Sequence, residues 1–188
     1  IISYQMNDGG AAPNQSLTTN KNVSITLIND APFVTLSATP ATFTEKQGAI
    51  FVDPTLQLND FDTVNLVSAN VTISGNSLAP VGEDFLSFTN STGVTGTFNP
   101  ATSTLSLSAT TAMTAAQWQS VLRSVTYFDT SVTPSTLPRT IQFVVNDGNS
   151  QNAPATRQVN VISVNDPPVI TASPSSLQYT EQGSPITI

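Results

Sequence analysis

Short runs rich in Val, Thr, Ile and Phe recur along most of this chain, and Gly, Pro, Asn and Asp separate them at intervals of roughly 8–12 residues. Within several runs apolar and polar residues alternate, as in Thr-Leu-Ser-Leu-Ser at 104–108. Alternation with a period of two gives a strand one apolar and one polar face. The pattern predicts an all-β fold, and more narrowly an Ig-like, cadherin-like Greek-key β-sandwich. The runs that we expect to form strands in the central part of the chain are residues 33–38, 49–58, 66–75, 84–90, 93–100, 103–109, 124–129, 139–147 and 156–164.

One segment departs from this pattern. Thr114 and Gln117 have the spacing of a helix capping box. Apolar residues follow at the spacing of one helix face, at Trp118, Val121, Leu122 and Val125. We therefore expect a short helix over an edge or end of the sandwich, with Trp118 anchored in the core.

The chain also repeats itself. Asn-Asp-x-Pro occurs at 29–32 and again at 165–168, and the same separation of 136 residues carries Phe-Thr-Glu at 43–45 to Tyr-Thr-Glu at 179–181. A self-match of this length indicates tandem repeats. We expect residues 1–30 to be the C-terminal end of a preceding repeat, 31–166 one complete repeat and 167–188 the start of the next, so that the chain is a segment of a longer protein.

Most of the acidic residues lie in short boxes that recur in the repeat or lie beside it. Taken singly, each box has an ordinary structural explanation: Asn-Asp-Gly is a tight turn, Asn-Asp-x-Pro an extended linker and Asp-x-Asp a solvated loop. The acidic residues of these boxes are Asp8 and Asp147 (Asn-Asp-Gly), Asp30 and Asp166 (Asn-Asp-x-Pro), Glu45 and Glu181 (Thr-Glu), and Asp60 and Asp62 (Asn-Asp-Phe-Asp).

The direction of the strands changes this interpretation. Strands of a sandwich run end to end, so the loop holding Asp60 and Asp62 should share one end with Asp147, where the linker bearing Asn29 and Asp30 also arrives. Two like charges about 5 Å apart repel by roughly 3 kcal/mol at an effective dielectric constant of about 20, so such a cluster favours a cation. Oxygen ligands without His or Cys select a hard ion, and a flexible carboxylate site favours Ca²⁺ over Mg²⁺.

These boxes together resemble the cadherin-like tandem repeats of large bacterial surface adhesins, of the RTX-adhesin type, and the stretch TAAQWQSVLRSVTY at 114–127 is similar to one common in those repeats. The resemblance implies calcium ions between successive repeats. The ligands that it implies are Asp60, Asp62 and Asp147 at one end, with Asn29 (through its carbonyl) and Asp30 from the linker; Glu45 with Asn165 and Asp166 at the other end; and the equivalent positions Asp8 and Glu181 in the neighbouring repeats. The chain departs from animal cadherins in lacking their Asp-Arg-Glu box, for which Asp129 is a weak substitute.

The amino-acid composition limits which binding partners and activities we expect. The formal net charge is −7 with only five Lys and Arg residues, which argues against nucleic acid and anionic membranes. Without His or Cys the chain has no imidazole or thiolate nucleophile, and the adjacent pair Glu83-Asp84 would face opposite sides of a strand. We therefore expect no enzymatic activity.

The function that we expect is that of a non-catalytic, calcium-binding structural repeat of an extracellular surface or adhesin protein, in which Ca²⁺ stiffens the junctions with adjacent repeats of the same chain. A second hypothesis is a filament subunit that joins other copies by strand addition. A third, less favoured, is a glycan-binding module, since most aromatic residues fall at strand-core positions.

Overall fold

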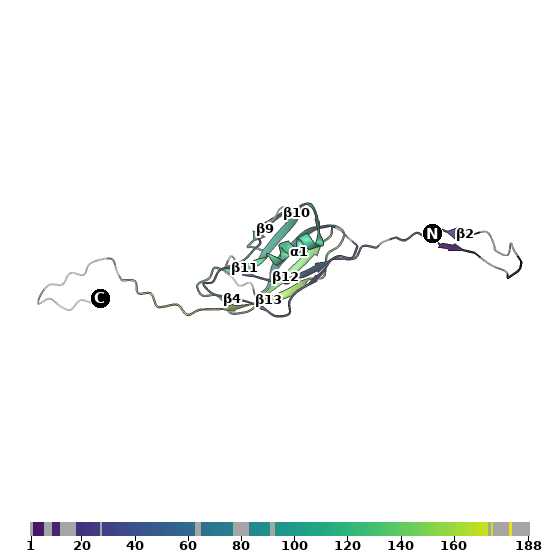
Figure 1. Cartoon of the computed structure of the whole chain (residues 1–188). Coiled ribbons are helices and arrows are strands. Elements are labelled where there is room, and N and C mark those ends of the chain that lie inside the picture. Colours follow the sequence, from purple (N-terminus) through teal and green to yellow (C-terminus); the bar gives the residue numbers. More distant parts are fainter. Residues whose placement is uncertain are drawn as a thin grey trace.

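The structure is a computed structural model that describes residues 2–5, 9–11, 18–26, 28–62, 65–76, 83–90, 93–172, 174 and 181. Figure 1 shows a central body of strands with one helix, and a hairpin near the N-terminus that lies apart from it. The strand and helix bounds are β1 Ile2–Tyr4, β2 Thr19–Lys21, β3 Phe33–Thr35, β4 Ala41–Thr44, β5 Ile50–Phe51, β6 Gln57–Asn59, β7 Asn65–Gly75, β8 Asp84–Ser87, β9 Val94–Asn99, β10 Thr104–Thr114, α1 Ala115–Arg123, β11 Thr126–Asp129, β12 Arg139–Asn146 and β13 Ala155–Ile162.

The described residues of the central body form three sheets. One has six strands in the order β4-β13-β12-β7-β10-β9, one has three in the order β5-β11-β8, and β3 pairs with β6 in a two-stranded sheet. The two larger sheets share an apolar core, where the rings of Phe43 (β4) and Tyr127 (β11) meet edge to face with centroids 5.4 Å apart. The prediction of an all-β class with one short helix is confirmed, and so is the half-buried alternation over 104–108.

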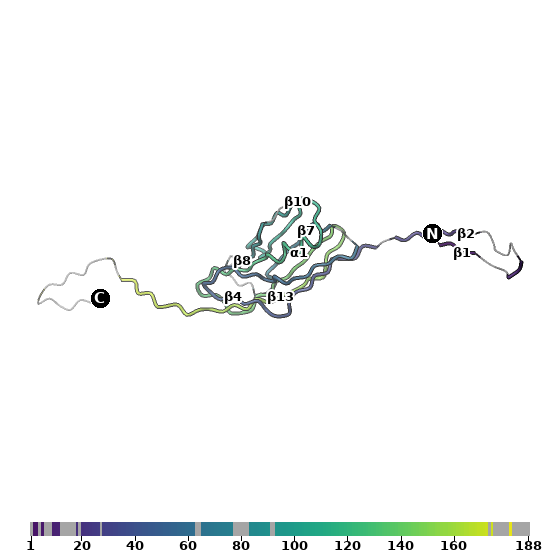
Figure 2. Tube along the Cα trace, in the orientation of Figure 1, coloured from purple at the N-terminus to yellow at the C-terminus, as the bar shows by residue number. Residues whose placement is uncertain are grey.

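Strand directions decide which loops share an end of the body. β12 is antiparallel to both β7 and β13, and β4 is parallel to β13 at the edge of the six-stranded sheet. The loop after β6, the turn after β12 and the linker before β3 consequently lie at one end, which we call the upper end. The loop after β4 and the segment after β13 lie at the opposite end, which we call the lower end. In Figure 2 this is the left side of the body, where the yellow segment after β13 leaves it.

The prediction of one strand over 49–58 is wrong. The segment forms β5 and β6 with a turn between them, because Asp53 is fully buried and accepts hydrogen bonds from the amides of Ser37 (2.7 Å) and Thr55 (3.0 Å). The Arg157 guanidinium pairs with the same carboxylate at 2.8 Å. A buried, hydrogen-bonded Asp followed by Pro interrupts a run that its apolar residues alone make look continuous.

Helix α1 forms as its sequence predicts. The Thr114 side chain accepts from the Gln117 amide (3.3 Å) and the Gln117 side chain accepts from the Thr114 amide (2.9 Å), which completes the capping box. Trp118 is 0% exposed and its indole N–H donates to the Leu66 carbonyl at 2.9 Å, so it is the core anchor that we expected. Val125 is buried as well, although the helix ends before it, at Arg123.

The helix also covers a strand edge. The Leu58 amide donates to the Gln119 side chain at 2.9 Å, and the Arg123 guanidinium donates to the Leu56 carbonyl at 2.7 Å. Two backbone groups around β6 thus bond to helix side chains, which holds the segment that leads into the loop at 60–62.

The N-terminal hairpin reproduces the register of the last hairpin of the body. β1 pairs with β2 so that Ile2 faces Lys21 and Tyr4 faces Thr19. In the body the corresponding strands pair Ile141 with Arg157 and Phe143 with Ala155, and these partners lie 139 and 136 positions further along the chain. The two hairpins therefore share one pairing pattern.

We expect Trp118→Ala to lower the free energy of unfolding by about 3–5 kcal/mol, because it removes the largest fully buried side chain of the core. Trp118→Phe keeps most of that volume and loses the indole hydrogen bond, so its cost should be about 1–3 kcal/mol. Urea unfolding followed by circular dichroism measures both. A cost below about 1 kcal/mol for the Ala variant would contradict the core assignment.

Candidate functional site

The upper end brings together the five residues that the sequence analysis placed there. Asn29 and Asp30 come from the linker before β3, Asp60 and Asp62 from the loop after β6, and Asp147 from the turn after β12. We call these five residues the upper cluster. Segments more than a hundred residues apart in sequence thus meet at one point of the fold.

Hydrogen bonds attach the linker to the body at this point. The Asn29 side-chain amide donates to the Asp147 carboxylate at 2.9 Å and to the Ser150 hydroxyl at 2.8 Å, and its carbonyl accepts from the Asn149 side chain at 3.1 Å. The backbone amide of Asp30 donates to the Asp62 carboxylate at 2.7 Å. Both residues of the Asn-Asp box therefore bond to the central body.

Asp147 is the most enclosed carboxylate of the upper cluster, at 6% exposed. Its Oδ1 accepts from the backbone amides of Asn149 (2.6 Å) and Ser150 (2.7 Å), while Gly148, at φ +99, makes the turn. Burial raises the pKa of this carboxyl, but the hydrogen bonds from Ser150, Asn29 and Asn149 outweigh burial and lower the pKa to about 2. The carboxylate is consequently held in its charged form.

The chain turns in the loop at 60–62. Residues 61 and 62 form a bend, and the Asp62 amide donates to the Asp60 carboxylate at 3.2 Å. Phe61, between the two acids, is 81% exposed. The two carboxylates lie at the same end because the loop turns, rather than because alternate residues of a strand share a face.

At the lower end the structure joins Glu45 to the outgoing segment. The Glu45 residue is 3% exposed, and its Oε2 accepts from the Ser163 hydroxyl (3.0 Å) and the Val164 amide (2.8 Å). Lys46, which the sequence analysis did not assign to this site, forms ion pairs with both Glu45 (3.7 Å) and Asp166. We call Glu45, Lys46 and Asp166 the lower cluster.

The two Asn-Asp boxes have the same local geometry. The Asn29 side chain donates to the carbonyl of Asp30 at 3.0 Å, and the Asn165 side chain donates to the carbonyl of Asp166 at 3.2 Å. Of the remaining candidates, Glu181 is exposed in a turn, and Asp8 lies outside the described residues.

Within the ranges that the structure describes, no three Asp, Glu, His or Cys side chains form a group that could hold a metal ion. Hydrogen bonds join the linker to the body in the upper cluster. Metal binding at the ten candidate residues therefore stays a prediction.

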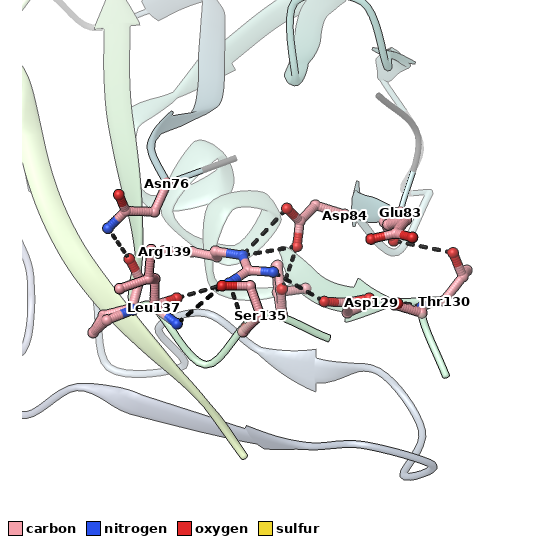
Figure 3. Close-up of polar contacts among 11 residues, drawn as sticks. Asn76, Glu83, Asp84, Asp129, Thr130, Ser135, Leu137 and Arg139 are labelled. Carbon is pink, nitrogen blue, oxygen red and sulfur yellow. Dashed lines mark hydrogen bonds and ion pairs between the residues drawn. The ribbon is translucent and has the colours of Figure 1, made fainter. Parts of the chain in front are cut away.

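Arg139, at the start of β12, organises a buried network that the sequence analysis missed. It is 2% exposed and pairs with Asp84 at 3.0 Å and Asp129 at 3.1 Å, and it donates to the carbonyls of Ser135 and Leu137 (Figure 3). The Tyr127 hydroxyl donates to the same Asp84 carboxylate. Asp129 is thus a partner of a buried arginine, which corrects its assignment as a substitute junction acid.

The alternation of inward and outward positions along the strands is the sequence signal that could have predicted this network. Asp84 begins β8 and Asp129 ends β11, and both fall on the inward positions of those strands. Burial raises the pKa of Asp129, and Asp84 raises it further, although the Ser131 amide and Arg139 act in the opposite direction. An inward Asp on a strand requires a charged or hydrogen-bonding partner, and Arg139 supplies it.

Comparison with protein-family models, with curated proteins and with solved structures gives no match. Among the described residues, no helix combines the length and apolar character that crossing a bilayer requires.

The contribution of Asp147 to stability should disappear in acid. Its pKa is lowered from 3.8 to about 2 in the folded state, so its ionised form stabilises the fold fully above about pH 4, and the gain is lost as the pH falls toward about 2. Urea unfolding of the wild type and Asp147→Asn across this range should show a stability difference that shrinks below about pH 4. Glu83→Gln is the charge-matched control. A difference that stays constant with pH would contradict the prediction.

Arg139→Met should destabilise the fold by about 3–5 kcal/mol, because it leaves two buried carboxylates without their cation. Adding Asp84→Asn and Asp129→Asn to the same chain should recover most of this loss, since the uncompensated charges are then gone. Chemical unfolding of the single and triple variants compares the two. A triple variant no more stable than Arg139→Met would mean that packing, and not charge, gives the network its effect.

Proposed function

We propose that this chain is a non-catalytic structural repeat of a long extracellular surface protein, a cadherin-like Greek-key sandwich that binds calcium where successive repeats meet. The ion at the upper end fixes the linker from the preceding repeat against the body, so that adjacent repeats of the same chain form a stiff rod. The rod holds a binding domain away from the cell surface.

One observation carries this proposal: the linker residues Asn29 and Asp30 bond directly to Asp147 and Asp62 of the following body. The upper cluster thereby combines acidic groups of the repeat with the chain that enters it. Any cation held among these groups also restrains the linker, which couples ion binding to the angle between repeats.

The chemistry of the donors fits Ca²⁺. All donors of the upper cluster are carboxylate or amide oxygens, which hard cations prefer, and they come from loops that can adjust to a ligand shell of six to eight oxygens. Asp60, Asp62, Asp147 and Asp30 would bind through carboxylates, and Asn29 through its side-chain carbonyl. The ion supplies the positive charge that neutralises these groups.

Basic side chains are engaged elsewhere in the fold. Arg139 pairs with Asp84 and Asp129, Arg157 with Asp53, and Lys46 with the lower cluster. These three cations therefore do not neutralise the upper cluster. Its carboxylates consequently attract a cation from solution.

Extracellular calcium modules typically have Kd values of about 10⁻⁴–10⁻³ M. At ten to a hundred times Kd, each ion would stabilise the folded repeat by about 1.4–2.7 kcal/mol. The gain is modest for one repeat and large when summed over an array.

A second candidate function is self-assembly through strand addition. β9 is an edge strand of the six-stranded sheet, and its residues 95–97 are exposed and uncharged. Such an edge can accept another strand. Sedimentation at increasing protein concentration distinguishes the two functions, because a spacer repeat stays monomeric and a filament subunit associates.

Thermal melting of the chain in millimolar Ca²⁺ and in excess EGTA tests the calcium proposal. We expect a rise of several degrees that is specific to Ca²⁺ over Mg²⁺, because the ion binds only the folded upper cluster. The Asp60→Asn/Asp62→Asn variant should lose this rise.

Glu83→Gln is the control, since it changes a carboxyl group outside both clusters and should keep the full calcium response. An unchanged response in the double variant would remove the loop at 60–62 from the site. A wild type with no calcium response would leave the acidic boxes as turns and linkers only.

A further inference from the structure

The buried carboxylate of Glu45 points to a cation at the lower end. Its side chain is 2% exposed, and Oε2 is satisfied by Ser163 and Val164. The other oxygen, Oε1, is buried and accepts no hydrogen bond from the residues that the structure describes; the ammonium of Lys46 lies 3.7 Å from it. Burying a carboxylate is costly without a compensating charge, so the position requires a cation.

Lys46 supplies that charge from within the chain. It has a left-handed backbone with φ 68, which is unfavourable for a residue with a side chain, in a turn closed by the Gln47 amide and the Thr44 carbonyl (3.1 Å). From this turn its ammonium contacts both Glu45 and Asp166. One cation thus links the body of the repeat to the linker that leaves it.

The lysine does not recur at the one corresponding position that the sequence contains. Under the 136-residue offset Glu45 corresponds to Glu181, Asp166 corresponds to Asp30, and Lys46 corresponds to Gln182. The acidic positions of the lower cluster therefore recur, whereas its cation does not.

We propose that Lys46 is a built-in cation of the lower junction, which takes the position between Glu45 and Asp166 that a divalent ion would need. This inference deepens the proposed function and rests on it for the comparison with calcium. The lower cluster is then charge-compensated without calcium, by an ammonium of the same chain. A Ca²⁺ ion entering the lower cluster would meet the repulsion of an ammonium already there.

Lys46→Gln in the full chain tests the inference, because it installs the residue of the corresponding position. Lys21→Gln is the matched control, since it removes the same charge from the N-terminal hairpin. Hydrogen exchange in EDTA measures the stability of the junction without metal. The Val164 amide donates to Glu45, so its exchange should accelerate in Lys46→Gln and not in Lys21→Gln. The expected acceleration is about two- to fivefold, which corresponds to the free energy that an exposed ion pair contributes.

Calorimetric titration with CaCl₂ measures how many calcium ions each variant binds. We expect Lys46→Gln to bind one more Ca²⁺ per chain than the wild type and Lys21→Gln, because the lower cluster then presents carboxylates without an ammonium. If no variant binds calcium, the proposed function fails, and the exchange measurement in EDTA still decides the role of Lys46.

Two results would overturn the inference. The first is a Lys46→Gln variant that matches the wild type in both Val164 exchange and calcium stoichiometry. The second is an intact mass lower than the sequence mass by one water and lost in Lys46→Gln, which would mean that the amine and the Asp166 carboxyl have condensed to an amide and that no free ammonium remains.

Discussion

The scarcity of cations constrains where this chain can place its carboxylates. It has twelve Asp and Glu residues and five Lys and Arg residues, so basic side chains cannot match the acids one to one. Inside the fold, where desolvation makes an uncompensated charge most costly, Arg139 serves Asp84 and Asp129, and Arg157 serves Asp53. Of the acids in the recurring boxes, Asp62, Asp147, Glu45 and Asp166 lie at the two ends, where backbone amides, the Asn29 side chain or the Lys46 ammonium contact them.

This division explains why part of the architecture could be predicted from the sequence. Strand polarity follows from the chain running end to end, so loops fall alternately at the two ends, and Asp62 and Asp147 had to share one of them. The capping box at Thr114 and the apolar face that follows it are local signals, and α1 forms where they lie. Both inferences use only spacing and direction, which short-range sequence patterns encode well.

Other features depend on contacts between distant segments, and no local pattern reveals them. The apolar residues of 49–58 predict one strand. Asp53, however, accepts a hydrogen bond from the Ser37 amide and pairs with Arg157, and the strand is divided there. Lys46 was overlooked because a residue next to Glu45 on a strand would face the opposite side. Its left-handed φ turns the chain after β4 and sends the ammonium back toward Glu45.

The two ends of the repeat are chemically unequal although their linkers have the same local geometry. In both Asn-Asp boxes the Asn side chain donates to the next carbonyl, so the linker itself does not distinguish them. The difference lies in the body: the upper end offers Asp62 and Asp147 to linker N–H groups, whereas the lower end offers Glu45 together with an ammonium. On the proposed function, the residue after the Thr-Glu box affects how strongly a junction responds to calcium. Position 46 has Lys and its counterpart at 182 has Gln, so on that proposal the two junctions to which these positions belong would differ in their dependence on the ion.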